Sequence, residues 1–285
     1  MTLILLATCE SIPDLTEDDQ ALIAPLAKRG IEARPAVWSD ASIPWPAADA
    51  VLIRSCWDYH LRRPEFLAWI ASLEQAGVRV WNPPAMLRWN ADKIYLRDLE
   101  RKGVAIVPTL WPEKGFQLQQ ELRKYSWTKA VIKPRVSATA YRTVLTSAGE
   151  TNEAQALADD LLRGPGAMLQ EFMEEVSTRG EWSLIFFSGK FSHAVLKIPK
   201  AGDFRVQHDF GGAERIAEAP ESVIRAASRV IGALESVPLY ARVDGVESGS
   251  QFLLMELELI EPALFLKLAE GAAERFADTI AARCS

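Results

Sequence analysis

The first eighty residues alternate short apolar runs with segments of helical periodicity, and this alternation restricts the fold more than any other feature of the chain. Short apolar runs predict buried strands, and a period of about 3.6 residues predicts amphipathic helices. Both helical segments end at a glycine, Gly30 and Gly77, as helices commonly do. This βαβα order predicts a parallel sheet of the α/β class. The expected strands are 2–7, 31–37 and 47–55, and the expected helices are 18–30 and 64–77.

A pair of prolines, Pro83 and Pro84, ends this pattern, and we place a domain boundary there, with residues 1–88 as an N-terminal α/β substrate domain. Beyond it, residues 182–199 predict two strands around Ser188-Gly189. Residues 220–235 predict an amphipathic helix, and residues 239–262 predict a second strand pair around a Gly-Ser-rich turn. The remainder of the chain is therefore expected to contain antiparallel sheet.

The composition excludes several classes of protein. Hydrophobic residues make up 49% of the chain, which is enough to form hydrophobic cores. The formal net charge of -6 does not provide the positive surface that binds nucleic acid. No stretch is long and apolar enough to span a bilayer, and the N-terminal apolar run lacks the preceding basic residues of a signal peptide. The three cysteines are widely spaced, which predicts a reducing, cytoplasmic setting and no zinc site.

An acidic strand, LLMELELIEP at 253–262, places carboxylates among apolar residues. Because side chains alternate along a strand, Glu256 and Glu258 share one face, whereas Met255 and its alternating neighbours Leu257 and Leu259 face the other way. The preceding strand of the predicted hairpin brings Asp244 beside them. Three carboxylates on adjacent strands suit Mg²⁺. The alternative is a solvent-facing strand with ordinary surface glutamates.

Two lysines lie where phosphate could bind. Lys133 ends a β-branched run and precedes a loop of small residues, 135–143, whose backbone N–H groups could approach phosphate oxygens. Lys93 lies near the start of a predicted helix. The sequence LQEFMEE at 169–175 offers backbone edges and acids for an adenine and a ribose. Either lysine alone could equally be a solvated surface charge.

The order of these pieces over residues 89–266 resembles the ATP-grasp superfamily, in its glutathione-synthetase-like branch. The segments IRSCWDYH, WNADKIYL, FSHAVLKIPKAGDFRVQ, YARVD and LLMELELIEPALF look like those of ATP-grasp enzymes related to D-cycloserine synthetase. The resemblance implies a two-part α+β grasp over residues 89–285, with a lid at about 105–169 and a metal- and phosphate-binding subdomain at about 170–285.

The resemblance also implies which residues bind ATP. Lys93 and Lys133 match the phosphate-binding lysines, and Lys133 is also expected near the transferring phosphoryl group. Glu181 matches the ribose-binding acid, with Glu174 as a competitor for that role. The linker that holds adenine would be Gln170, Glu171, Phe172 and Met173.

For the metal, the resemblance implies Mg²⁺ bound by Asp244, Glu256 and Glu258, with Glu258 where many members have asparagine. Arg242 matches the arginine at the transferring phosphoryl group, and Arg205 is a second candidate for it. The loop at 135–143 lacks the glycines of the family lid.

These parts imply an ADP-forming ligase that phosphorylates a small carboxylate, so that an amine can attack the acyl phosphate. A cyclising substrate that carries its own nucleophile, such as O-ureido-D-serine, or a pair of amino acids, would fit the resemblance. A nucleotide-binding regulatory protein with a retired site and a kinase remain alternatives. The expected partner is therefore a small-molecule substrate, and we expect the protein to bind neither nucleic acid nor a membrane. A homodimer is compatible with the sequence.

Polar residues follow the predicted strand that ends near residue 55, at the edge where open α/β sheets bind ligands. Arg54 could hold a carboxylate and Asp58 an amine. The alternative is a structural ion pair between these two, with Trp57 in the core. The predicted substrate-binding residues are Arg54, Ser55, Asp58, Tyr59 and His208.

Overall fold

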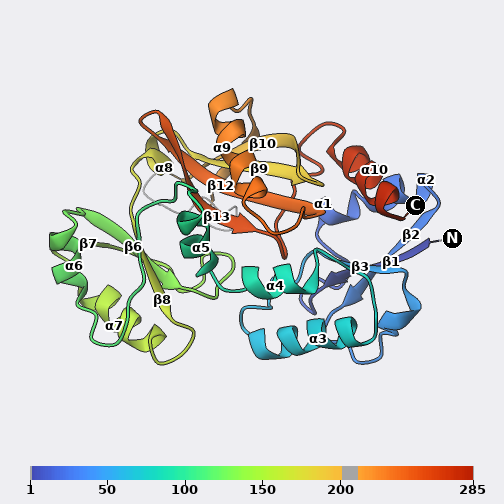
Figure 1. Ribbon diagram of the computed structural model, residues 1–285, viewed down its shortest axis with the longest axis horizontal. Helices are drawn as coiled ribbons and strands as arrows, with labels where there is room; N and C mark the ends of the chain where they lie inside the picture. The colour runs from blue at the N-terminus through green and yellow to red at the C-terminus, as the bar shows by residue number, and fades with distance from the viewer. Residues whose placement is uncertain (1, 201–210, 285) are drawn as a thin grey trace.

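The computed structural model describes residues 2–200 and 211–284, and its strands form three separate sheets (Figure 1). The sheets draw their strands from residues 2–81, 109–171 and 181–258 in turn. The boundary predicted after residue 88 falls inside helix α4 (Pro84–Asn90), which connects the first sheet to the rest. No helix of the described residues combines the length and the apolar character needed to cross a membrane.

The N-terminal sheet is parallel throughout, with strand order β2-β1-β3-β4, so the α/β prediction is confirmed. Apolar side chains from both of its faces are buried, as expected for a parallel sheet covered on both sides. Its strands are β1 (Thr2–Thr8), β2 (Ile31–Val37), β3 (Ala50–Ile53) and β4 (Val80–Trp81). Helices α1 (Glu17–Gln20), α2 (Ile23–Lys28) and α3 (Arg63–Gln75) and the 3-10 turn η1 (Trp45–Ala47) connect them.

The prediction of a single helix over residues 18–30 is wrong, because this segment forms two separate helices, α1 and α2. Thr16 caps α1 by accepting a hydrogen bond from the backbone N–H of Asp19. Pro25 is the third residue of α2 and could not have lain inside one long helix without removing a backbone hydrogen bond. The break places Asp19 in the protein interior, at 4% exposure.

The second sheet is small and antiparallel, in the order β5-β8-β6-β7. It has its own hydrophobic core, in which Trp127, Ile132 and Leu169 pack against its two helices. Its elements are β5 (Thr109–Leu110), α6 (Leu118–Lys124), β6 (Lys129–Pro134), β7 (Val144–Ser147), α7 (Asn152–Leu161) and β8 (Ala167–Glu171). In Figure 1 it projects away from the other two sheets.

The third sheet is antiparallel in the order β11-β10-β9-β12-β13, and both predicted strand pairs are neighbours within it. Helix α9 (Glu221–Gly232) packs on one face through Val223, Ala227 and Val230, which confirms the amphipathic helix expected there. The strands are β9 (Glu181–Phe187), β10 (Lys190–Ile198), β11 (Ala213–Ile216), β12 (Tyr240–Ser248) and β13 (Gln251–Glu258). The remaining helices of this half are α5 (Tyr95–Arg101), α8 (Glu175–Thr178) and α9 (Glu221–Gly232).

The C-terminal helix α10 (Ala272–Cys284) packs between the first and third sheets (Figure 1). Phe276 stacks on Phe187 of β9 with ring centroids 4.5 Å apart, and Ile280 belongs to the same core as Ile4 of β1. The first sheet therefore shares a core with the last helix of the chain.

Buried side chains also join the N-terminal domain and α4 to β12, β13 and the residue that follows β13. The amide of Asn82 donates to the carbonyl oxygens of Tyr240 and Leu259, each at 2.9 Å. Asn90 donates to Leu257 at 2.8 Å, and the Tyr240 hydroxyl lies 2.8 Å from the carbonyl of Ile53. These bonds satisfy polar groups in the interior and fix the position of the acidic strand β13.

A β-bulge interrupts the pairing of β12 with β13, where Asp244 lies opposite Glu256 but Gly245 lies opposite Leu254. The backbone of β13 approaches Gly245 so closely that an added Cβ would lie 2.4 Å from the carbonyl oxygen of Leu253. We expect Gly245→Ala to lower the free energy of unfolding by about 2–3 kcal/mol, because the sheet must open to admit a methyl group. Urea denaturation measures this change.

The matched control is Gly232→Ala at the end of α9, where an added Cβ meets nothing within 4 Å. Alanine favours a helix over glycine, so the control should keep or slightly raise the stability. Equal stability of Gly245→Ala and wild type would contradict the tight packing at the bulge.

Candidate active site

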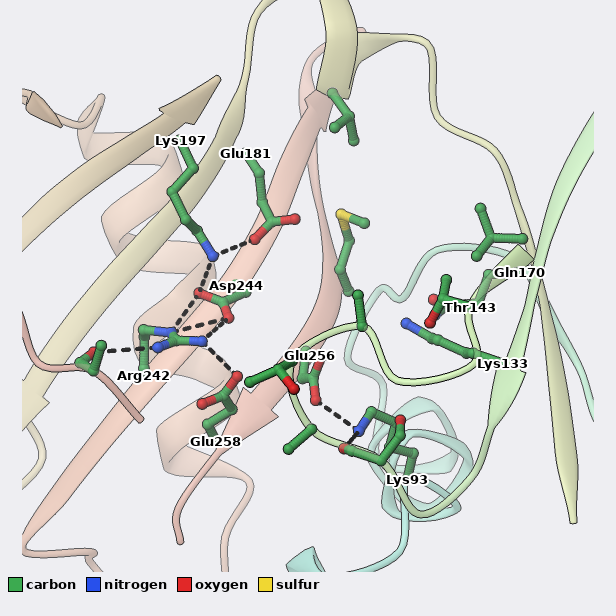
Figure 2. Close-up of a pocket in the computed structure, with 18 of the residues that line it drawn as sticks. Lys93, Lys133, Thr143, Gln170, Glu181, Lys197, Arg242, Asp244, Glu256 and Glu258 are labelled. Carbon is green, nitrogen blue, oxygen red and sulfur yellow. Dashed lines mark hydrogen bonds and ion pairs between the residues drawn. The ribbon is translucent and has the colours of Figure 1, made fainter. Parts of the chain in front are cut away.

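A cavity opens between the second and third sheets, and Figure 2 shows charged side chains facing each other across it. Lys93, Lys133, Thr143 and Gln170 lie on one side. On the other side lie the side chains of β9, β10, β12 and β13, namely Glu181, Lys197, Arg242, Asp244 and Glu258. The structure thus brings together predicted residues that are up to 165 positions apart in the sequence, from Lys93 to Glu258.

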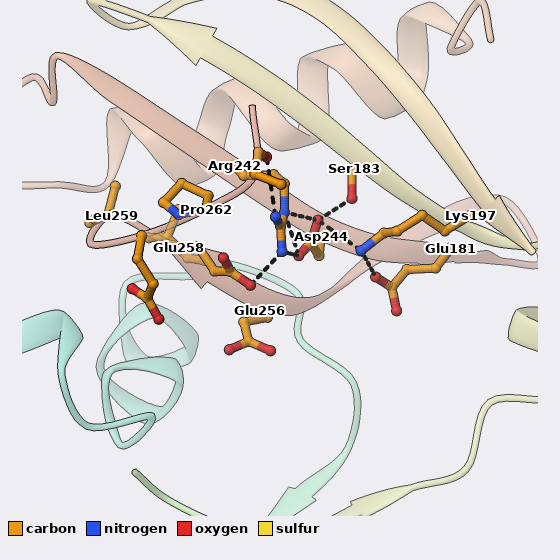
Figure 3. A network of polar contacts seen from close by, with 12 residues as sticks. Glu181, Ser183, Lys197, Arg242, Asp244, Glu256, Glu258, Leu259 and Pro262 are labelled. Atoms are coloured by element: carbon orange, nitrogen blue, oxygen red, sulfur yellow. Dashed lines mark hydrogen bonds and ion pairs between the residues drawn. The ribbon is translucent and has the colours of Figure 1, made fainter. Parts of the chain in front are cut away.

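Arg242 is the centre of an ion-pair network (Figure 3). Its Nε lies 3.0 Å from Oδ2 of Asp244, and its Nη2 pairs with Glu258 on the neighbouring strand. Ser183 of β9 donates a further hydrogen bond to Asp244. The guanidinium therefore forms ion pairs with two of the three predicted metal ligands. Glu258 is within its reach because Arg242 and Glu258 lie opposite each other on neighbouring strands.

Lys197 extends this network, and the sequence analysis did not select it. Its Nζ lies 2.6 Å from Oε1 of Glu181 and 3.6 Å from Oδ1 of Asp244. A lysine inside the apolar run AVLKI of β10 was the available signal, because buried lysines are rare unless paired.

The two predicted phosphate lysines differ in their surroundings. Lys93 is buried and its Nζ lies 2.9 Å from Glu256, with a further hydrogen bond to the carbonyl of Ser137. Lys133 reaches into the cavity from β6, and within the described residues its ammonium has no acidic partner. Burial lowers the pKa of Lys133, and Lys93 adds to this effect against the attraction of Glu256. An anion bound beside Lys133 would stabilise its charge.

The carboxylates differ in their electrostatics. Burial disfavours the charge of Asp244, but Arg242, Lys197 and Ser183 together outweigh it, so the pKa of Asp244 is lowered. Burial likewise disfavours the charge of Glu256, but Lys93 and Lys133 together outweigh it, so the pKa of Glu256 is lowered as well. Burial raises the pKa of Glu258 to about 7, and repulsion by Glu256 and Asp244 adds to this against the attraction of Arg242. The cluster therefore holds carboxylates close together against mutual repulsion.

The donor set of Asp244, Glu256 and Glu258 fits Mg²⁺ in its chemistry, because all three offer carboxylate oxygens to the same cavity. Among the described residues, no three Asp, Glu, His or Cys side chains lie close enough together to hold a metal ion. Their oxygens are drawn instead to Arg242, Lys197 and Lys93. Binding of the metal would thus exchange some of these ion pairs for coordination.

Met255 also lines the cavity, so the expectation that it faces away from the glutamates is wrong. Met255 is the extra residue of the bulge, because Glu256 and Leu254 lie opposite consecutive residues of β12. A bulge interrupts the alternation of side chains between the two faces of a strand.

The second sheet contributes the opposite wall. Ser137 to Ala140 and Thr143 line the cavity from the loop after β6, and Thr139 and Ala140 have positive φ angles of 50° and 54°. Gln170, Glu171, Phe172 and Met173 also line it, at the end of β8. Glu174 does not, because its side chain is largely exposed and pairs with Lys129 at 2.8 Å.

The predicted substrate residues of the N-terminal domain lie outside the cavity. Arg54 is 1% exposed, and its Nε lies 2.8 Å from Asp19, with the carbonyl of Pro262 as a further acceptor. Ser55 is buried and donates to the same Asp19. The prediction that Arg54 contacts the substrate is therefore wrong. Arg54 forms a buried structural ion pair, and its partner is Asp19 rather than Asp58.

Asp58 accepts a hydrogen bond from the indole of Trp38, and Tyr59 is buried against Phe66. Trp57 lines the cavity, so the alternative that places this side chain in the core is wrong. Arg205 and His208 lie outside the described residues.

Comparison with solved structures places this arrangement in a class. The crystal structure of D-cycloserine synthetase DcsG matches with a TM-score of 0.89 and 28% identity, over 99% of this chain and 100% of that one. D-alanine–D-alanine ligase from Bacillus anthracis matches with a TM-score of 0.73 at 18% identity, over 100% and 98% of the two chains, which shows the shared fold. The three sheets and the charged cavity between them define an ATP-grasp ligase.

Sequence comparison gives the particular family. Cycloserine biosynthesis protein DcsG of Streptomyces lavendulae is 31% identical to this chain over an alignment of 277 residues, and the match covers 89% of each protein. The family model of the N-terminal domain of D-cycloserine synthetase DcsG matches residues 4–82. The chain belongs to the D-cycloserine synthetase family, and it is an ATP-dependent ligase.

The corrected position of Arg54 leads to a prediction about stability. Arg54→Ala should lower the free energy of unfolding by about 3–5 kcal/mol, because Asp19 would remain buried without its cation. Arg34→Ala, which removes an exposed pair with Glu32, should change it by less than about 1 kcal/mol. Urea denaturation compares the two variants. Wild-type stability of Arg54→Ala, together with a raised KM, would restore the substrate role of Arg54.

Proposed function

We propose that this ligase uses ATP and Mg²⁺ to phosphorylate the carboxylate of a small amino-acid derivative, and that an amine-type nucleophile then displaces the phosphate. The observation that carries the proposal is the convergence of Lys93, Lys133 and Arg242 with three carboxylates on one cavity. Similar chains include a cycloserine biosynthesis protein and a D-cycloserine synthetase, which supports a product of that chemical class.

The nucleotide would lie between the second and third sheets. Gln170 to Met173 would contact the adenine, and Glu181, held by Lys197, would accept from the ribose hydroxyls. Lys133 and Lys93 would contact phosphate oxygens, and the backbone of the loop at 137–140 lies on the same wall.

Asp244, Glu256 and Glu258 would hold magnesium, which supplies positive charge at the phosphate oxygens. Arg242 is fixed by Asp244 and Glu258, so its guanidinium is oriented before the substrate arrives. A preoriented cation at the transferring phosphoryl group stabilises the charge that develops there. A carboxylate oxygen of the substrate attacks the γ-phosphorus and ADP leaves; the nucleophile then attacks the acyl carbon and phosphate leaves.

ADP release in the presence of a panel of amino acids, amines and O-ureido-D-serine tests the proposal. We expect release to require a carboxylate together with a nucleophile, in one molecule or in two. Mass spectrometry of the product then separates ring closure from the joining of two substrates. A stable phosphorylated product would favour a kinase, and no stimulated release by any compound would favour a retired site.

We predict that Glu258→Gln keeps the fold but loses at least about tenfold of the magnesium-dependent turnover, because the nearly isosteric change removes one ligand charge. Thermal melting and ADP release across a magnesium titration measure both effects on one preparation. An unchanged magnesium dependence would contradict the assignment of Glu258 to the metal.

We also predict that Lys133→Ala weakens ATP binding by about tenfold or more without loss of stability, because Lys133 is desolvated and has no acidic partner among the described residues. Calorimetric titration with a non-hydrolysable ATP analogue measures the affinity. Lys190→Ala, an exposed lysine of β10, is the matched control and should bind as wild type does. Equal affinities of all three proteins would refute the phosphate contact.

A further inference from the structure

Glu261 is an acidic residue of the cavity that the proposed reaction does not use. It follows β13 by three residues, its side chain is 9% exposed, and it lines the cavity close to Glu258. Within the described residues no other side chain donates a hydrogen bond to its carboxylate or forms an ion pair with it. A buried carboxylate without a cation is unfavourable, so its presence requires an explanation.

The nearby cations are already engaged. Lys93 pairs with Glu256 and bonds to Ser137, and Arg242 pairs with Asp244 and Glu258. Burial raises the pKa of Glu261 well above its usual value, and repulsion by Glu258 adds to this. A positive group entering the cavity at this point would therefore find a carboxylate that forms no ion pair with any cation of the described residues, although the charge of Lys93 attracts it.

Trp57 completes the surroundings of Glu261. Its indole Nε1 donates to the backbone carbonyl of Glu261 at 3.1 Å, and its side chain lines the same cavity. Trp57 is the one residue of the described N-terminal domain, 2–88, that does so. A carboxylate and an indole that line the same cavity could receive an alkylammonium group through an ion pair and a cation–π contact.

We infer that Glu261 and Trp57 form a subsite for the protonated amine of the substrate. This inference rests on the proposed function, and it adds that the small acid is a zwitterion. Its carboxylate would face Arg242 and the γ-phosphate, and its ammonium would face Glu261 at the end of the cavity towards the N-terminal domain. The Arg54–Asp58 pair predicted from the sequence is thereby replaced, because both of those side chains are engaged elsewhere.

The test is a binding titration that requires no turnover. Wild type and Glu261→Gln are titrated by calorimetry with O-ureido-D-serine and with its deamino analogue, in which hydrogen replaces the ammonium group. A non-hydrolysable ATP analogue and magnesium are present throughout. The wild-type protein should bind the amine probe about 10- to 100-fold more tightly than the deamino probe, as expected for one charge-assisted contact.

Glu261→Gln should bind the two probes with affinities that differ by no more than about threefold, because glutamine keeps the shape of the side chain but removes its charge. Glu270→Gln, an exposed glutamate of the following loop, is the matched control and should keep the full preference. Glu261→Asp, which retains the charge but withdraws it by one methylene, should give an intermediate preference. Thermal melting of each variant verifies that it is folded at the assay temperature.

The outcomes separate the inference from the proposed function. A wild-type preference near unity, or no binding of the amine probe, overturns the inference, and so does a folded Glu261→Gln with the wild-type preference. If Glu261→Gln does not fold, an unreduced preference in Glu261→Asp overturns it equally. ADP release is measured separately with the same probe. Selective binding without ADP release would contradict the proposed ligase reaction and leave the amine subsite supported.

Discussion

The ion-pair network around Arg242 is the constraint on which the rest of the site depends. Arg242 and Asp244 lie two residues apart on β12, Glu258 is opposite on β13, and Lys197 approaches from β10. Each of these charges would be costly to bury alone, and each is stabilised by another. The strands must therefore keep their exact register, because a slip of one residue would move every side chain of the shifted strand to the opposite face. The arrangement of charges in the cavity therefore depends on the register of the third sheet.

The surrounding structure holds this network from two sides in different ways. Asn82, Asn90 and Tyr240 join the N-terminal domain to β12 and β13 through buried hydrogen bonds, so displacement there would break several polar contacts at once. The second sheet has a separate hydrophobic core. A displacement of this sheet as a unit would leave that core intact. Lys133, which has no acidic partner among the described residues, lies on this second sheet.

The sequence predicted local and periodic features well. Alternation of side chains and a short turn were sufficient to place Asp244 beside Glu256, and the βαβα pattern gave the parallel sheet. Properties that depend on distant segments were not predictable. Arg54 pairs with Asp19, 35 residues before it, rather than with its close neighbour Asp58. The bulge that turns Met255 into the cavity, and the place of Lys197 beside Asp244, depend on strand pairing that composition and periodicity do not specify.

The position of α10 has a consequence for the order in which the protein can be made. Phe276, Ala277 and Ile280 of the last helix complete the core that contains Ile4 and Leu6 of the first strand. On the ribosome, the first eighty residues emerge long before this helix and must expose part of their apolar surface until it arrives. The N-terminal unit therefore cannot reach its final packing before α10 has been synthesised. The second sheet, which has its own core, can fold earlier.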